Sequence, residues 1–216
     1  TNVANAGGDF YELIDLDDDR LVFAIGDVAS HGVEAAGEMG RARIVIQAMA
    51  VAAAGDPARL ADQASAALNR KARPFTTACL ATYRPSTGRL TLTNAGHPFP
   101  IVRRRDGTVE LLTGTDGPPL GLRRKEGTAY TSSEHRLEAG DTLVLYTDGL
   151  VERRDESIDH GIDRLVELIA TLPADADLAN RLFDELCGGP HDDDIAVMAI
   201  TVTGSGLVTP PAAGRR

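Results

Sequence analysis

The sequence has only two cysteines, Cys79 and Cys187, among 216 residues. They form no CxxC pair, so neither a zinc site built on thiolates nor a disulfide framework is indicated. Cys79 falls within an apolar strand-like stretch, and Cys187 falls near the end of a helical one. We therefore expect both thiols to be reduced and buried.

Long hydrophobic runs and a basic excess are also missing. The longest uninterrupted apolar run, residues 48–54, is far too short to cross a bilayer, and no signal peptide is recognisable. Twenty-two Lys and Arg residues stand against 32 Asp and Glu, which gives a net charge of −10. Nucleic-acid binding demands a basic face, which this composition disfavours. The sequence predicts a cytoplasmic protein with neither a membrane nor a nucleic acid as its partner.

The apolar content is sufficient for one ordinary core. Hydrophobic residues make up 43% of the chain, which suits a single domain of this length. We expect that domain to span residues 1–203. Residues 204–216 are rich in Gly, Pro and Ala and predict a flexible tail or linker. A start at Thr1 in place of a methionine is typical of a domain taken from a longer protein.

Strand-like segments alternate with turn signals through most of the chain. Strands are expected at residues 10–16, 21–26, 76–83, 89–94, 101–105, 109–113, 142–147 and 195–203. Short loops between them imply antiparallel hairpins. Helices are expected at residues 33–54, 58–72, 162–170 and 178–187. Helices grouped apart from meandering strands predict an α+β fold, a β-sandwich of two antiparallel sheets flanked by helices.

Four aspartates stand where these strand-like segments begin or end: Asp9, Asp27, Asp148 and Asp193. If neighbouring strands run antiparallel, the exit of one lies beside the entrance of the next, and the four carboxylates meet at one rim. Two carboxylates about 4 Å apart in a partly screened site repel by roughly 4 kcal/mol, so such a cluster needs raised pKa values or bound cations. Oxygen ligands without a soft donor favour Mg²⁺ or Mn²⁺.

Three further motifs admit simpler interpretations. Residues 15–19 are acidic, but the sixth and twelfth positions of a calcium loop are filled by Arg20 and Gly26, so a solvated hairpin turn fits better. His31 stands at the entrance of the first helix, where either capping and packing or proton transfer is consistent with the sequence. His97, in a tight turn after a strand, is expected to be structural rather than catalytic.

Five motifs follow one another along the chain: GGDFYE (7–12), IGDVASHGVEAA (25–36), TNAGHPFP (93–100), GDTLVLYTDGLVE (140–152) and DDDIAV (192–197). In this order and spacing the chain resembles the metal-dependent (PPM-type) serine/threonine protein phosphatases. Within them it is similar to the bacterial branch named for the sporulation phosphatase SpoIIE and the stress-response phosphatase RsbU. The resemblance implies a β-sandwich with flanking helices and two Mn²⁺ or Mg²⁺ ions at one end.

The resemblance also implies roles for particular residues. Asp27 should bridge both ions, with the backbone carbonyl of Val28 helping to hold one of them. Asp148 and Asp193 should hold the other ion, and Asp9 should contact the first ion directly or through water. Two neighbours, Asp192 and Asp194, fall beside this set. His31 is the best available proton donor to the leaving oxygen, with water as the alternative.

The chain departs from the family pattern at three places. Ser30 replaces the usual glycine before the histidine of the second motif and restricts the backbone there. Glu12 stands where an aspartate is common, and we expect this change to matter little. The strand that normally precedes Gly7 is largely missing.

The activity implied by the resemblance is hydrolysis of phosphoserine or phosphothreonine by a metal-activated water. The expected substrate is a phosphorylated anti-anti-sigma factor or a similar bacterial regulator, which would connect the protein with sigma-factor regulation and stress response. Regulatory domains are expected in the full-length protein, and a homodimer is left open. One alternative is a catalytically silent phosphatase-like binding module. Another is a two-metal nuclease or phosphodiesterase, which the negative charge disfavours.

Overall fold

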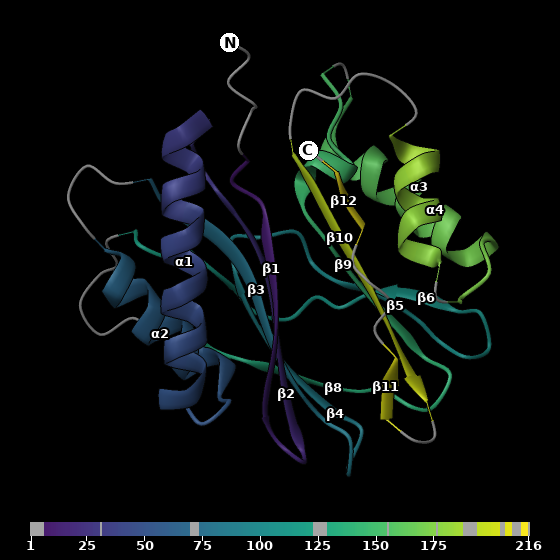
Figure 1. The fold of residues 1–216 in the computed structure, drawn as a ribbon. Helices are drawn as coiled ribbons and strands as arrows, with labels where there is room; N and C mark the ends of the chain where they lie inside the picture. Colours follow the sequence, from purple (N-terminus) through teal and green to yellow (C-terminus); the bar gives the residue numbers. More distant parts are fainter. Residues whose placement is uncertain are drawn as a thin grey trace. The chain divides into compact units, whose positions relative to one another are not determined.

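The computed structural model describes residues 7–30, 32–69, 74–122, 129–154, 156–175, 177–187, 194–203, 206–208 and 213–215. The chain divides into two compact units, each built around one sheet (Figure 1). The first unit comprises Thr1–His97 and Gly114–Arg136, and the second comprises Pro98–Thr113 and Leu137–Arg215.

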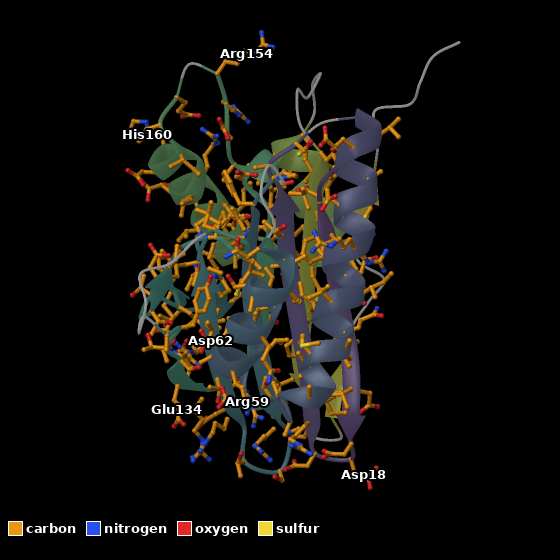
Figure 2. The ribbon with its side chains drawn as sticks, turned by 90° about the vertical axis from the view of Figure 1, so that its left-hand side faces the viewer. Asp18, Arg59, Asp62, Glu134, Arg154 and His160 are labelled. Atoms are coloured by element: carbon orange, nitrogen blue, oxygen red, sulfur yellow. The ribbon has the colours of Figure 1, made fainter. Side chains whose placement is uncertain are left out.

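The sheet of the first unit is nearly all antiparallel. Its order is β1 (Phe10–Asp17), β2 (Arg20–Val28), β3 (Thr76–Arg84), β4 (Arg89–Ala95) and β7 (Asp116–Gly117), with β8 (Ser133–Arg136) also paired to β4. Among the described strands of this sheet, β4 and β7 alone pair in parallel. The β1–β2 hairpin turns at Asp18, which is exposed at its tip (Figure 2). The acidic run is thus a hairpin turn, as its composition predicts.

Two helices, α1 (Gly32–Ala52) and α2 (Pro57–Leu68), lie along one face of this sheet (Figure 1). The buried positions of α1 are mainly alanines around Ile46, and small side chains let the helix approach the strands closely. Asp56 caps α2, because its carboxylate accepts hydrogen bonds from the backbone N–H groups of Ala58 and Arg59. Pro57 in the first turn loses no helical hydrogen bond.

The second unit has the strand order β11 (Gly206–Val208), β10 (Ile195–Thr203), β9 (Thr142–Tyr146), β5 (Ile101–Arg103) and β6 (Val109–Leu111), and β12 (Ala213–Arg215) also pairs with β10. Helices α3 (Ile158–Thr171) and α4 (Leu178–Leu186) pack on this sheet. Leu165 and Leu182 are fully buried with Val144 and Val197 in one apolar cluster. Burial of the apolar helix faces therefore holds α3 and α4 in place.

The predicted α+β class, with two sheets and four helices among the described residues, is confirmed. Every expected strand and helix has an observed counterpart. Helix α2 ends at Leu68 with Asn69 as its C-cap, and residues 70–72 of its predicted span lie outside the described residues. The strands that the sequence did not predict are short: β7, β8, β11 and β12. Two of them, β11 and β12, lie within residues 204–216, which we expected to form a linker. The domain boundary at residue 203 stays a prediction.

Candidate active site

Gly8 packs against the end of β2 in the first unit. A Cβ atom placed on Gly8 would lie 2.5 Å from Oδ1 of Asp27 and 2.6 Å from the backbone oxygen of Val28. A side-chain oxygen and a main-chain oxygen therefore flank the same point, and only the absence of a side chain at Gly8 leaves room for both. Two hard oxygen donors are brought together at this strand end.

Asp9 immediately precedes β1, and continuing the register of β1 and β2 by one residue puts it opposite Asp27. The ladder pairs Phe10 with Gly26, and the backbone N–H of Val28 donates to the carbonyl of Gly8 at 3.3 Å. The two segments therefore stay in register as far as Gly8. The intervening pair is Asp9 and Asp27. Directly opposed residues in an antiparallel pair have Cβ atoms about 5 Å apart. Both aspartates are partly exposed, so ions in solvent can reach this strand end.

In the second unit, Asp148 follows β9 and begins a single 3₁₀ turn, Asp148–Leu150. Its Oδ1 accepts a hydrogen bond from the N–H of Gly149 at 3.0 Å. A Cβ atom on Gly149 would collide with the backbone oxygen of Asp194, so the turn after β9 packs directly on the residue that precedes β10. The expected adjacency of one strand's exit and the next strand's entrance is present here.

Thr147 fixes the two strand ends that carry Asp148 and Asp194. Its hydroxyl accepts a hydrogen bond from the N–H of Ala196 at 2.8 Å and donates to the carbonyl of the same residue at 3.3 Å. The backbone N–H of Thr147 donates to that carbonyl as well, at 3.0 Å. Because Thr147 is fully buried, these bonds are not in competition with water.

Glu12 makes a side-chain interaction that the sequence did not predict. The Glu12 side chain is only 7% exposed. Its carboxylate accepts hydrogen bonds from Nε of Arg43 and, at 2.7 Å, from Nε2 of Gln47. Glu12 lies on β1, three residues after Asp9, and both partners lie on α1. The glutamate therefore ties this helix to the strand that begins at the candidate site. No local sequence signal pairs residues 31 and 35 positions apart.

The turn after β4 is held by reciprocal hydrogen bonds. Nδ2 of Asn94 donates to the carbonyl of His97 at 2.6 Å, and the N–H of His97 donates back to Oδ1 of Asn94 at 2.8 Å. Nδ1 of the buried His97 ring lies 3.0 Å from the hydroxyl of Thr77 on β3. The expectation that His97 is structural agrees with this geometry, but its contact with Thr77 was not predicted.

Two predicted site residues, His31 and Asp193, lie outside the described residues, as does Asp192. Asp9, Asp27 and Val28 belong to the first unit, whereas Asp148 and Asp194 belong to the second. Among the described residues, no group of three or more His, Cys, Asp or Glu side chains is arranged to hold a metal ion. Within the first unit the structure brings Asp27 and Val28 to one strand end, and within the second it places the turn that begins at Asp148 beside Asp194.

Both thiols are buried and neither is part of a disulfide bond, as predicted. Burial raises the pKa of the Cys79 thiol to about 12. Burial also raises the pKa of Cys187, to about 11. Both side chains are therefore protonated near neutral pH, and a protonated thiol is a poor nucleophile.

Comparison with known proteins identifies the family. The family model for stage II sporulation protein E (SpoIIE) matches residues 17–203. Protein IcfG of Synechocystis sp. is 26% identical, over 91% of this chain and 36% of that protein.

The described helices include none with the length and apolarity to span a membrane.

Solved structures show the same fold. The RsbU and RsbW domains of Rv1364c from Mycobacterium tuberculosis match with a TM-score of 0.82 and 25% identity, over 99% of this chain and 58% of that chain. The PP2C phosphatase domain of SpoIIE from Bacillus subtilis, with a fragment of its regulatory domain, matches with a TM-score of 0.78 and 18% identity, over 99% and 63% of the two chains. This chain thus spans less than two thirds of the length of each of these relatives. The chain belongs to the SpoIIE family, in the SpoIIE/RsbU branch of the metal-dependent PPM-type serine/threonine phosphatases.

Proposed function

We propose that this chain is a metal-dependent phosphoprotein phosphatase that hydrolyses phosphoserine or phosphothreonine. Membership of the PPM-type family supports phosphatase chemistry. The observation that carries the proposal is the convergence of Oδ1 of Asp27 and the carbonyl of Val28 beside Gly8, with Asp9 opposite Asp27. An all-oxygen donor set at a solvent-accessible strand end suits a hard divalent cation.

The donor set fits Mn²⁺ or Mg²⁺ better than Zn²⁺, because the donors are carboxylate and carbonyl oxygens. In this proposal Asp27 and Val28 hold one of two ions, with Asp9 contacting it directly or through water. Asp148 and Asp193 would supply the ligands of the other ion, and Asp27 is the residue that would be shared by the two ions. Bound divalent ions would lower the pKa of a coordinated water and offset the charge of the phosphoryl oxygens.

The residues of the chain itself have two tasks in this reaction. Opposed carboxylates such as Asp9 and Asp27 repel each other, so they favour a cation between them over an empty site. In the proposal His31, the residue before Gly32 in the sequence, donates a proton to the leaving seryl or threonyl oxygen. No side chain of the protein needs to act as the nucleophile.

The substrate in this proposal is a phosphorylated anti-anti-sigma-type regulator. The similar Mycobacterium tuberculosis structure contains RsbU and RsbW domains, and another similar structure belongs to a study of the bacterial stressosome. The chain spans only 36% of IcfG and 58% of the Mycobacterium tuberculosis chain, so fused regulatory domains in a longer cytoplasmic protein belong to the same proposal.

The experiment compares three aspartates that differ only in position. Phosphate release from an aryl phosphate and from phosphoserine peptides is measured with Mn²⁺, with Mg²⁺ and with EDTA. Asp27→Asn and Asp148→Asn should each lower the rate at least ~100-fold, because a catalytic metal supplies several kcal/mol of transition-state stabilisation. Asp18→Asn, at the exposed hairpin tip, is the matched control and should leave the rate unchanged (Figure 2).

Turnover retained in both site variants would overturn the assignment. Calorimetric Mn²⁺ binding by the wild-type chain, together with no hydrolysis of any phosphoprotein or aryl phosphate, would instead support the catalytically silent binding module.

A further inference from the structure

Residues Asn94–His97 form a tightly held loop. The imidazole ring of His97 faces β3, the strand that pairs with β2 beside Asp27. The reciprocal hydrogen bonds between Asn94 and His97 close the loop, and Gly96 adopts a positive φ of 69°. A Cβ atom on Gly96 would lie 2.8 Å from Cδ of Pro119, so the loop is also packed tightly against a neighbouring segment. With only 6% of His97 exposed, its ring has little freedom to rotate.

Thr77 connects this ring to β2. Its hydroxyl lies 3.0 Å from Nδ1 of His97 and 3.4 Å from the backbone oxygen of Asp27, which is its partner in the β2–β3 register. A carbonyl oxygen can only accept, so the hydroxyl donates to Asp27. The hydroxyl then accepts from the ring, which assigns the proton to Nδ1 of His97.

Two hydrogen bonds hold the peptide group between Asp27 and Val28, one on its carbonyl side and one on its N–H side. The carbonyl of Asp27 accepts from Thr77 at 3.4 Å, and the N–H of Val28 in the same peptide plane donates to Gly8 at 3.3 Å. Both bonds are long and individually weak. Because the peptide group is planar, however, the two bonds add to the β2–β3 ladder in restricting its rotation. That rotation determines where the carboxylate of Asp27 and the carbonyl of Val28 point.

We propose that His97 is a positioning residue that acts through Thr77 to orient the metal-binding peptide Asp27–Val28. This inference rests on the proposed function, because it assigns His97 and Thr77 to the outer shell of the same metal site. Such residues do not contact the metal themselves but hold its ligands in the right orientation. Their loss typically weakens metal binding.

The test measures Mn²⁺ affinity by calorimetry alongside Mn²⁺-dependent phosphate release. Thr77→Val keeps the shape of the side chain and removes the hydroxyl, and His97→Ala removes the ring. Each variant should weaken Mn²⁺ binding by ~10–100-fold, the usual effect of losing an outer-shell partner. At saturating Mn²⁺ the kcat should stay within ~3-fold of the wild type, because the ligands themselves remain.

Conservative variants should rescue binding. Thr77→Ser keeps the hydroxyl, and His97→Asn presents an N–H donor near the position of Nδ1, so both should bind Mn²⁺ like the wild type. The double variant Thr77→Val/His97→Ala should be no weaker than either single variant, because both changes break the same chain of contacts.

Thr82→Val is the matched control. Thr82 lies on the same strand and its buried hydroxyl donates to the carbonyl of Gly55 at 2.5 Å, away from Asp27. This variant should lose stability without losing Mn²⁺ affinity. Equal weakening of Mn²⁺ binding by Thr82→Val would show that Thr77 acts through general stability and would overturn the proposal.

The proposal is also overturned if Thr77→Val binds Mn²⁺ like the wild type while Asp27→Asn does not, a result that leaves the proposed phosphatase function intact. Absence of turnover in the wild-type chain would count against the proposed function alone, since the calorimetric comparison of Thr77→Val with Thr82→Val still decides the role of Thr77.

Discussion

Gly8 and Asp27 are packed so closely that a methyl group on Gly8 would lie 2.5 Å from Oδ1 of the aspartate. The carbonyl of Val28 would lie at 2.6 Å from the same methyl group. Contacts this short do not occur between a carbon and an oxygen that are not bonded. The glycine therefore marks the point at which two oxygens of the candidate metal site converge.

Gly8→Ala should disrupt metal binding, because either the Asp27 carboxylate or the strand end must move away. We expect Mn²⁺ affinity to fall by ~10-fold or more, as for other changes that misplace a ligand. Calorimetry and Mn²⁺-dependent phosphate release measure this loss.

Gly37→Ala is the control for that change. Gly37 is exposed within α1, and a Cβ atom there would meet no heavy atom within 4 Å. Alanine should stabilise the helix by about 0.5–1 kcal/mol and leave Mn²⁺ binding unchanged. Unaltered Mn²⁺ affinity in Gly8→Ala would show that the strand end does not hold the metal.

Gly149→Ala tests the corresponding contact in the second unit. The added methyl group would collide with the backbone oxygen of Asp194 and lie 3.2 Å from Cγ1 of Ile195. The turn that carries Asp148 must then shift away from β10. We expect a lower phosphatase rate at limiting Mn²⁺ that partly recovers at high Mn²⁺. A lower melting temperature with an unchanged Mn²⁺ dependence would contradict this prediction.

Arg43→Ala should lower the free energy of unfolding by about 1–2 kcal/mol, measured by urea denaturation, because it removes a charged hydrogen bond from the buried carboxylate of Glu12. The loss of unfolding free energy should be smaller than for a fully buried pair, because the Arg43 side chain is 45% exposed and water screens its charge.

Arg89→Ala is the matched control for Arg43→Ala. Arg89 pairs with Glu134, which lies on the surface of the first unit, and both side chains are more than half exposed (Figure 2). Its removal should change the unfolding free energy by only about 0–1 kcal/mol. Equal losses for the two arginine variants would show that burial of Glu12 adds nothing to the interaction.

The native protein should resist thiol reagents at pH 8. With pKa values of about 12 for Cys79 and about 11 for Cys187, both raised by burial, almost no thiolate is present at that pH. A colorimetric disulfide reagent should react only slowly with the folded chain. After denaturation in guanidinium chloride, it should react readily with both thiols. Rapid labelling of the folded chain would show that one of the thiols is accessible and ionised.

Much of the fold is predictable from local patterns. Alternating or continuous apolar residues predict the long strands β1, β2, β3, β9 and β10, and the Asp56–Pro57 pair predicts the start of α2. The short strands β7 and β8 are not predictable in this way, since segments of two and four residues exist only where β4 offers backbone groups for pairing. The same holds for β11 and β12 beside β10.

By itself, the sequence determined which residues begin or end the strand-like segments, because apolar patterning stops where the chain leaves the sheet. It thereby singled out Asp9, Asp27, Asp148 and Asp193. Only the tertiary structure decided which groups meet there. The contacts of Gly8 with Asp27, and of Thr77 with Asp27 and His97, join residues 19 to 50 positions apart, and strand register and close packing create them. No local preference of the chain encodes a contact that forms only when separate strands pair.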